Sequence, residues 1–378
     1  MTPRPLKEIE TPSVLVDRDR LNANLDRMQR LATKGNVRLR PHVKTHKCLQ
    51  IAELQLERGA IGVTASKVDE ALMFIGCGVK SMTVAYPIVD DRKLRRLLAA
   101  AQDEDVEIRV VADSAYGVGV LAGVAMEFTK PLSVFLKIDV GLHRCGLEET
   151  DACLPEVARL ISATPGLRFA GLLSHAGHAY AAKHREQVAA IAGDERAILQ
   201  RVRRQLEADG IEVNEVSVGS TPTVLASDTF EGLTELRPGN YVFLDATALR
   251  LGVATLNQVA LTVLVTIVSA NDSYFIIDAG SKVLSSDLGA HGTGAGLGYG
   301  MAFPLRAEHA AATALKVVRL SEEHGFVTRG DADLPIGSKL QIVPNHACPV
   351  ANLTEKLTII SGEEILDEWK VAARGCVR

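Results

Sequence analysis

The chain has 378 residues, of which 47% are hydrophobic and 23% charged, and its formal net charge is −4 at pH 7. This composition is typical of a soluble protein with room for one large domain and a smaller one. The slightly acidic balance offers no basic surface for nucleic acid, and no apolar run is long enough to span a bilayer. Residues 1–10 do not resemble a signal sequence, and the six cysteines are scattered without CxxC spacing. We therefore expect a cytoplasmic protein with free thiols that binds neither nucleic acid nor membrane.

Eight short runs rich in apolar and β-branched residues predict strands in the N-terminal part of the chain. Segments with helical periodicity separate most of them, for example 91–102 and 183–209. This alternation argues for parallel strands joined by crossover helices, and eight such units predict a (β/α)8 TIM-like barrel. A doubly wound open sheet is the competing fold, but no GxGxxG motif follows an early strand. The predicted strands are 37–43, 60–65, 81–85, 107–112, 132–138, 168–174, 215–218 and 235–244.

The first predicted strand runs into the sequence RPHVKTHK at residues 40–47. Cationic neighbours and partial desolvation lower the pKa of a lysine, so Lys44 is a candidate nucleophilic amine that could carry a Schiff base. The alternative is a solvated basic turn or an anion-binding surface. Because a barrel builds its site from the loops after its strands, we expect Lys44 to meet the polar residues that follow the other strands. These are Asp139 and Arg144, residues 175–180, residues 219–223, and Asn240 and Tyr241 within the eighth strand.

The sequence VGSTPT at 218–223 has the composition of a phosphate-binding loop. Glycine lets the backbone approach a phosphate, serine and threonine add hydroxyl groups, and the N-terminus of a helix follows. The same residues also suit a simple N-cap with proline in the first helical turn. The sequence alone leaves both interpretations open.

The pattern changes after residue 246, where short runs rich in Val, Thr and Ile are separated by Gly, Asn or Asp. This predicts an antiparallel β-domain, completed by the N-terminal segment 13–17. We therefore divide the chain into a barrel at 20–245 and a β-domain at 1–19 and 246–378. The glycine-rich stretch 289–300 is assigned to no element, and its GxGxxG-like string is discounted because no parallel βα unit surrounds it.

The β-domain contains the sequence PNHACP at residues 344–349. Side chains at positions i and i+2 of an extended segment share a face, so His346 and Cys348 are candidates to hold one metal ion. Imidazole and thiolate ligands favour zinc over magnesium or calcium. The alternative is a buried histidine beside a buried cysteine.

Taken together, these motifs resemble the fold-type III pyridoxal-phosphate enzymes, and within them the metal-dependent D-serine dehydratase and D-threonine aldolase group. The resemblance extends from Thr11-Pro12 to the sequence ARG at 373–375. It implies an alanine-racemase-like barrel with a C-terminal β-domain, pyridoxal 5'-phosphate as cofactor, and a homodimer.

The resemblance also implies roles for individual residues. The RPHxKxHK motif makes Lys44 the Schiff-base lysine, and DVGxxRCG at 139–146 places Arg144 near the phenolic oxygen of the cofactor. His175 corresponds to the residue stacked on the pyridine ring, and Tyr180 closes the same motif. His346 and Cys348 correspond to the metal pair, with Zn2+ expected and Mn2+ or Mg2+ as alternatives. The phosphate site corresponds to Gly219, Ser220 and Thr221 together with the Gly239-Asn240-Tyr241 turn.

Three details favour a dehydratase over an aldolase. Aldolases of the group tend to have HxD at the metal, GGGTGS at the phosphate loop and YHG or YQG after strand six, whereas this chain has HAC, VGSTPT and SHAGHAY. We therefore predict β-elimination from a β-hydroxy D-amino acid such as D-serine or D-threo-3-hydroxyaspartate, giving a 2-oxo acid and ammonia. In this mechanism Lys44 is the base and the metal assists departure of hydroxide. The alternatives are a metal-dependent D-threonine or 3-hydroxy-D-amino-acid aldolase and a non-catalytic cofactor-binding homeostasis protein.

Overall fold

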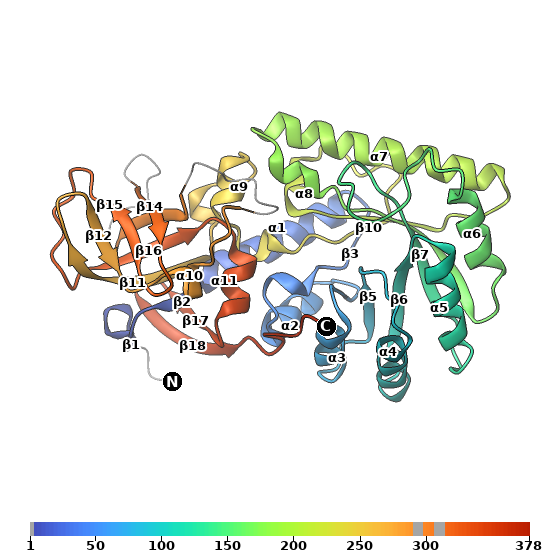
Figure 1. The fold of residues 1–378 in the computed structure, drawn as a ribbon, viewed down its shortest axis with the longest axis horizontal. Helices are drawn as coiled ribbons and strands as arrows, with labels where there is room; N and C mark the ends of the chain where they lie inside the picture. Colours follow the sequence, from blue (N-terminus) through green and yellow to red (C-terminus); the bar gives the residue numbers. More distant parts are fainter. Residues whose placement is uncertain (1–3, 290–297, 306–313) are drawn as a thin grey trace.

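Eight parallel strands form the larger sheet of the computed structural model, which describes residues 4–289, 298–305 and 314–378. The spatial order is β3-β10-β9-β8-β7-β6-β5-β4, and the ring closes where Thr64 N–H donates to the Pro41 carbonyl at 2.8 Å. The predicted barrel is therefore confirmed (Figure 1). The strands are β3 (Arg38–Leu39), β4 (Val63–Ala65), β5 (Ser81–Val84), β6 (Glu107–Ala112), β7 (Leu132–Lys137), β8 (Leu167–Leu173), β9 (Glu215–Val218) and β10 (Glu235–Leu236).

Helices cover the outside of this ring (Figure 1). Local sequence explains where several of them begin, because side chains such as Asp90 and Ser114 accept hydrogen bonds from the first free backbone N–H groups. The helix that follows Asp90 buries Leu94, Leu97 and Leu98 on one face. The helices are α1 (Arg18–Lys34), α2 (Leu49–Glu57), α3 (Val68–Ile75), α4 (Asp91–Asp103), α5 (Ala115–Ala125), α6 (Leu154–Ala163), α7 (Arg185–Ala208), α8 (Thr221–Ala226) and α9 (Ala246–Arg250).

The eighth strand is shorter than predicted. It ends at Leu236, and residues 240–242, predicted as strand, form the 3₁₀ helix η4 (Asn240–Val242). Pro238 has no N–H to continue the ladder. A Cβ atom on Gly239 would lie 2.8 Å from Thr45 Oγ1, so the chain also packs tightly at this point. Asn240 and Tyr241 consequently lie in the loop after the strand rather than within it.

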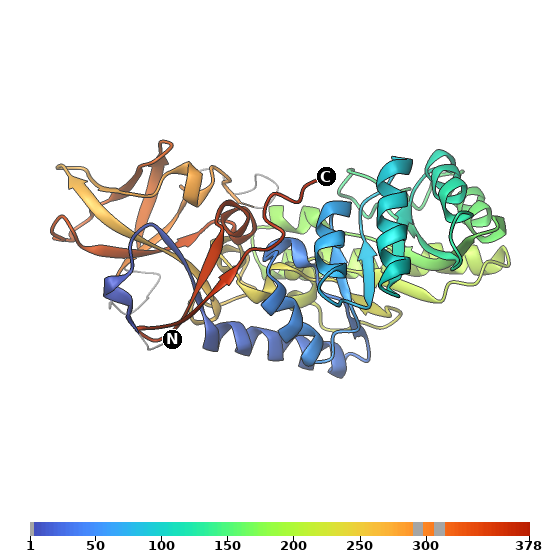
Figure 2. The same ribbon diagram turned by 90° about the horizontal axis from the view of Figure 1, so that it is seen from below.

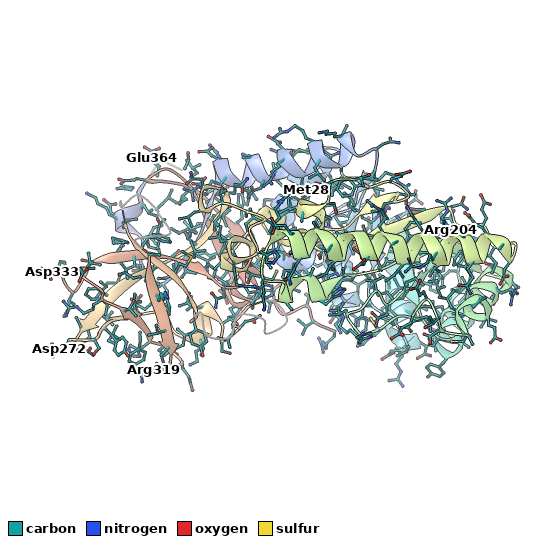
Figure 3. All side chains as sticks on the ribbon, turned by 90° about the horizontal axis from the view of Figure 1, so that it is seen from above. Met28, Arg204, Asp272, Arg319, Asp333 and Glu364 are labelled. Carbon is teal, nitrogen blue, oxygen red and sulfur yellow. The ribbon has the colours of Figure 1, made fainter. Side chains whose placement is uncertain are left out.

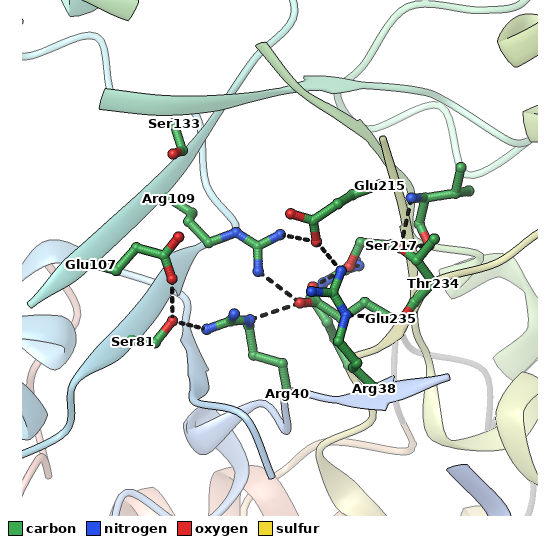
Figure 4. Close-up of polar contacts among 12 residues, drawn as sticks. Arg38, Arg40, Ser81, Glu107, Arg109, Ser133, Glu215, Ser217, Thr234 and Glu235 are labelled. Atoms are coloured by element: carbon green, nitrogen blue, oxygen red, sulfur yellow. Dashed lines mark hydrogen bonds and ion pairs between the residues drawn. The ribbon is translucent and has the colours of Figure 1, made fainter. Parts of the chain in front are cut away.

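A buried charge network fills the floor of the barrel (Figure 4). Glu235 Oε2 accepts hydrogen bonds from Arg40 Nε at 2.8 Å and from Arg109 Nη1 at 2.7 Å, and its side chain is fully buried. Burial by itself raises the pKa of Glu235, but Arg40 and Arg109 outweigh burial and lower this pKa to about 2. The carboxylate is therefore ionised in the folded protein at neutral pH.

We expect Glu235→Gln to lower the free energy of unfolding by about 3 kcal/mol or more, because two buried guanidinium groups lose their shared counter-charge. Urea unfolding at pH 7 measures this loss. The depressed pKa contributes stability above the ordinary pKa of about 4.5, and this contribution disappears as the pH falls through about 2. The difference between wild type and Glu235→Gln should therefore narrow between about pH 4.5 and pH 2. Glu149→Gln, which breaks an exposed pair with Arg201, is the control and should cost about 1 kcal/mol or less.

The second sheet contains ten strands from both ends of the chain, in the order β1-β18-β17-β2-β11-β12-β15-β14-β13-β16. Strand β2 pairs with β11 and with β17, which confirms that segment 13–17 belongs to the β-domain, and Figure 2 shows the N-terminal segment beside the C-terminal strands. The β2–β17 pair is parallel, so the domain is not antiparallel throughout. The strands are β1 (Arg4–Pro5), β2 (Ser13–Asp17), β11 (Leu261–Ala270), β12 (Tyr274–Ile277), β13 (Gly300–Pro304), β14 (Leu315–Leu320), β15 (Gly325–Thr328), β16 (Lys339–Pro344), β17 (Lys356–Ser361) and β18 (Glu364–Lys370).

The two sheets divide the chain in sequence as well as in space. Strands of the barrel lie between residues 38 and 236, and strands of the second sheet lie within 4–17 and 261–370. The domain boundaries at 19/20 and 245/246 stay a prediction. The glycine-rich stretch 289–300 lies mostly outside the described residues.

Charged side chains cover the outer surfaces, for example Arg204 on α7 and Asp333 at the far end of the β-domain (Figure 3). Met28 on α1 is by contrast almost fully buried. Among the helices of the described ranges, none has the length and apolar character that crossing a bilayer requires.

Candidate active site

Lys44 lies in the 3₁₀ helix η2 (Val43–Thr45), which follows strand β3 after residues 40–42. The ring nitrogen Nδ1 of His42 caps this helix by accepting a hydrogen bond from Lys44 N–H at 3.4 Å. Gly239 packs against Thr45 and the His42 carbonyl, so the loop after the eighth strand supports the same turn. The sequence-based prediction that Lys44 follows the first strand is therefore confirmed.

The surroundings of Lys44 favour its neutral amine. Burial is the main cause of its lowered pKa, and the positive charges of Arg144 and Arg237 act in the same direction, while the Cys348 thiolate and Glu70 oppose them. Desolvation and cationic neighbours, the two effects predicted, thus both lower this pKa, but the cations are Arg144 and Arg237 rather than the charged residues of the 40–47 motif. A lowered pKa leaves a larger fraction of a lysine as the neutral amine, which is the nucleophilic form.

Lys47, the other lysine of the motif, has a different environment. Its Nζ atom forms an ion pair with Glu70 at 2.8 Å and donates hydrogen bonds to the carbonyls of Ala373 and Cys376. These contacts fasten the C-terminal segment to the loop that carries Lys44. Lys47 is therefore a structural cation.

The predicted phosphate loop follows strand β9. Ser220 caps helix α8, as the simpler interpretation expected, and its Oγ atom accepts from Thr223 N–H at 3.4 Å. A Cβ atom on Gly219 would lie 2.7 Å from the main chain of Arg237, so only glycine fits beside the neighbouring loop. The Thr221 hydroxyl is buried and has no hydrogen-bond partner among the described residues. An unsatisfied buried hydroxyl is costly, which makes this loop a candidate binding site for a polar group.

The turn at residues 239–241 contains another buried polar atom that lacks a hydrogen-bond partner among the described residues. Asn240 Nδ2 donates to Asp245 Oδ2 at 2.6 Å, whereas its Oδ1 atom is buried without a partner in the described part of the chain. The Tyr241 side chain is buried, and its hydroxyl accepts a hydrogen bond from Gln55 at 2.9 Å. The Tyr241 hydroxyl therefore supports helix α2, and only its main chain belongs to this turn.

His175 and Tyr180 connect the sixth strand to the phosphate loop. His175 Nδ1 donates to the Gly219 carbonyl at 2.6 Å, and burial, then the charges of Lys44 and Lys137, lower the pKa of this ring well below its ordinary value. The imidazole is thus neutral. Burial raises the pKa of Tyr180, whose hydroxyl has a hydrogen bond from the main chain of Thr221. Both residues therefore face the loop that the sequence singled out.

Arg144 lies in the loop after β7 and is exposed to solvent. Its guanidinium charge contributes to the lowered pKa values of Lys44 and His175. The structure thus brings Arg144 to the same end of the barrel as the other predicted site residues. Asp139, in the same loop, accepts hydrogen bonds from the N–H groups of Gly141, Leu142 and His143 and so shapes the loop itself.

His346 and Cys348 come together, but not on an extended segment as predicted. His346 is the N-cap of helix α11 (Ala347–Leu353), and Cys348 lies in its first turn. The two side chains are hydrogen-bonded to each other. Cys348 Sγ also lies 3.2 Å from Thr45 Oγ1, so the pair adjoins the residue next to Lys44.

Each member of this pair favours the charged form of the other. Burial lowers the pKa of His346, but the Cys348 thiolate and Asp287 raise it to about 10. Burial raises the pKa of Cys348, but the charge and hydrogen bond of His346 and the hydroxyl of Thr45 lower it below its ordinary value. A thiolate is the form of cysteine that binds a metal.

Asp287 contacts this pair and is not among the residues predicted from the sequence. Its Oδ2 atom lies 2.7 Å from His346 Nδ1, and a carboxylate on one ring nitrogen is common around histidines that bind a metal through the other nitrogen. In the described residues no group of three or more His, Cys, Asp or Glu side chains forms a complete metal site. Two protein ligands by themselves fill only two of the four positions of a tetrahedral zinc site.

Three further buried residues were also missed. Asp245 Oδ2 accepts from Asn240 and from Ala347 N–H at 3.0 Å, and so joins the phosphate side to the His346 segment. Arg237 donates to the Ser174 carbonyl at 2.5 Å, directly before His175. Burial, then the charge of Arg237, lowers the pKa of Lys137 to about 7. Lys137 could have been found as a cation ending an apolar strand, whereas Asp245 and Arg237 carry no comparable local signal.

Comparisons with known proteins agree with this architecture. Residues 16–247 match the family model described as alanine racemase, N-terminal domain, and residues 260–360 match the putative serine dehydratase domain. The chain is 32% identical over 97% of its length to D-threo-3-hydroxyaspartate dehydratase of Delftia sp. (strain HT23), of which it covers 98%. It is 30% identical over 99% of its length to D-threonine aldolase of Arthrobacter sp., of which it covers 95%. D-serine dehydratase of Dictyostelium discoideum is 29% identical, with 97% of both chains covered.

A solved structure is also similar over nearly the whole chain. It is a cysteine-to-alanine mutant of D-threo-3-hydroxyaspartate dehydratase in the metal-free form, with a TM-score of 0.89, 31% identity, and coverage of 97% of this chain and 98% of that one. Solved alanine racemases, at 12–14% identity and TM-scores of 0.66–0.68, share the fold. The chain therefore belongs to the fold-type III pyridoxal-phosphate enzymes, in the group of lyases that contains these dehydratases and aldolases.

Proposed function

We propose that this enzyme is a zinc-dependent dehydratase that converts a β-hydroxy D-amino acid, such as D-serine or D-threo-3-hydroxyaspartate, into a 2-oxo acid and ammonia. One observation carries the proposal: the hydrogen-bonded pair of His346 and Cys348 adjoins Thr45, the residue next to Lys44. In this proposal a nucleophilic lysine and a soft metal-binding pair share one site. The D-threo-3-hydroxyaspartate and D-serine dehydratases among its relatives support this choice of substrates.

The residues present suit pyridoxal 5'-phosphate. The unsatisfied Thr221 hydroxyl and the close approach permitted by Gly219 suit a phosphate group, together with Ser220 and Asn240. Lys44, whose pKa is lowered, offers its amine for attachment, and His175, Arg144 and Tyr180 would surround the cofactor ring. When bound, the cofactor supplies an electron sink for the charge that develops at the substrate Cα.

The residues of the chain have separate tasks in this proposal. Lys44, with its lowered pKa, takes the Cα proton on its Nζ atom. His175 stays neutral, and its Nδ1–H group donates a hydrogen bond to the Gly219 carbonyl. Its imidazole therefore positions the cofactor ring without exchanging protons. His346 and Cys348 would hold zinc, whose Lewis acidity would assist the departure of the β-hydroxyl group. The side chain of Asp287 fixes the orientation of His346.

The pair His346 and Cys348 also bears on the alternatives. A retro-aldol reaction needs the β-hydroxyl deprotonated, and a metal at the same place can assist this step. An aldolase is therefore the second candidate function, which the D-threonine aldolase among the relatives supports. The thiolate ligand favours zinc and the dehydratase, because aldolases of the resembling group tend to have an aspartate there. A non-catalytic cofactor carrier would not need a metal pair beside Lys44. A cytoplasmic homodimer and the use of manganese or magnesium stay predictions from the sequence.

A substrate panel tests the proposal. We expect ammonia and a 2-oxo acid from D-serine or D-threo-3-hydroxyaspartate, each offered separately to the purified enzyme, at rates well above those with the L-enantiomers. D-threonine is the control for the aldolase, because cleavage would release glycine. The proposal would be wrong, and the enzyme an aldolase, if no ammonia formed and glycine were released instead. The expected aldolase products are glycine from D-threonine, or glycine and glyoxylate from D-threo-3-hydroxyaspartate.

A further inference from the structure

A cavity of about 470 Å3 opens at the end of the barrel opposite Lys44. It lies between the C-terminal end of α4, the loop before β7, and the first residues of β6, β7 and β8. Its size is that of a pocket for a small ligand. None of the predicted active-site residues lines it, so it is separate from the candidate active site.

The floor of the cavity is apolar and its rim is charged. Leu98 and Ile108 form part of the floor, each less than a tenth exposed, and the half-buried Phe128 forms part of a wall. Lys130 and Asp105 on the rim form an ion pair with each other. The chemistry available to a ligand is therefore an apolar surface beside charged groups.

Arg168 is the cation best prepared for a ligand. Its Nε and Nη2 atoms both donate to Ser133 Oγ, at 3.2 and 2.6 Å, and Ser133 is only 2% exposed. The guanidinium is thus held in place by a buried serine at the cavity, while its side chain remains 63% exposed. Its Nη2 atom also forms an ion pair with Glu107 at 3.6 Å, and within the described part of the chain its Nη1 atom makes no hydrogen bond. A fixed, accessible guanidinium edge is suited to a carboxylate.

We propose that this cavity binds a small monocarboxylate with an apolar body. The carboxylate would pair with Arg168, and the hydrocarbon part would cover Leu98, Ile108 and Phe128. The positive balance of the rim agrees with an anion, because Lys80 adds a third cation to Arg168 and Lys130, against the two carboxylates of Asp105 and Glu107.

Calorimetric titration of the full-length holoenzyme with hexanoate tests this site. We expect saturable binding, and binding about tenfold or more weaker for acetate, which lacks the body, and for hexan-1-ol, which lacks the charge. Arg168→Gln should weaken hexanoate binding about tenfold or more, because a charged hydrogen-bonding partner is lost. Arg159→Gln is the matched control, since Arg159 is a similarly exposed arginine that pairs with Asp209 away from the cavity.

Two outcomes would overturn the proposal. The first is hexanoate binding that Arg168→Gln leaves unchanged, or no binding at all. The second is binding that disappears in Lys44→Ala but survives in Arg168→Gln, since this would place hexanoate in the active site. If Arg168→Gln does not fold, Gln102→Trp serves instead, because Gln102 is an exposed residue of α4 at the cavity and the indole should block it.

Discussion

Lys44→Ala should abolish turnover of every substrate of this enzyme, with a loss in kcat of about 10²–10⁴-fold or more. The physical reason is that one amine both attaches the cofactor and takes the Cα proton, and its lowered pKa is a property of its buried position. Steady-state assays of ammonia release measure the loss. Binding of the cofactor should survive in part, because Gly219, Ser220 and Thr221 do not depend on the lysine.

Borohydride reduction of the wild-type enzyme gives an independent readout for the same residue. Peptide mapping should find the reduced cofactor on Lys44. Lys47 is the internal control, because its Nζ atom is engaged by Glu70 and by two carbonyl groups of the C-terminal segment. A cofactor adduct on Lys47, or undiminished turnover by Lys44→Ala, would show that the assignment is wrong.

Cys348→Ala should lower activity by about 100-fold or more and should leave the purified protein with less than stoichiometric zinc. Removing one of two protein ligands weakens both metal affinity and the positioning of the metal. Atomic emission spectroscopy measures the zinc content of the purified protein, and so reports the loss of metal affinity independently of turnover. Chelation of the wild type should likewise stop ammonia release while the visible absorbance of the cofactor persists, because Lys44 and the phosphate loop hold the cofactor independently.

Two other variants test the predicted metal site by smaller changes. Asp287→Asn keeps both ligands but weakens the hold on His346, so its zinc affinity should fall by about 10–100-fold. Cys348→Asp supplies a harder ligand and should favour manganese or magnesium over zinc. Full dehydratase activity in metal-free enzyme or in Cys348→Ala would mean that His346 and Cys348 form only a buried ion pair, and the leaving hydroxide would need another acid.

The sequence predicted the barrel and the position of Lys44 because both depend on local patterns. Alternating strands and helices can close in few ways, and a basic motif after the first strand must lie at the mouth of a barrel. The cap at Ser220 is local in the same sense. The sequence also indicated that His346 and Cys348 act together, but it assigned them to an extended segment, since six residues carry too little periodicity to distinguish a strand from a helix N-terminus.

Tertiary structure decided the contacts that turn these residues into one site. Thr45 and Cys348 are 303 residues apart in sequence, and Asp287 lies 59 residues before His346, so no local pattern could pair them. The same holds for Glu235, whose low pKa depends on Arg40, which follows β3, and on Arg109 of β6. Burial and neighbouring charge shift the pKa values of Lys44 and Cys348, and both effects exist only when the distant segments are packed together. The sequence by itself therefore determined which residue types stand at the ends of the strands, and the folded chain decided their ionisation and their partners.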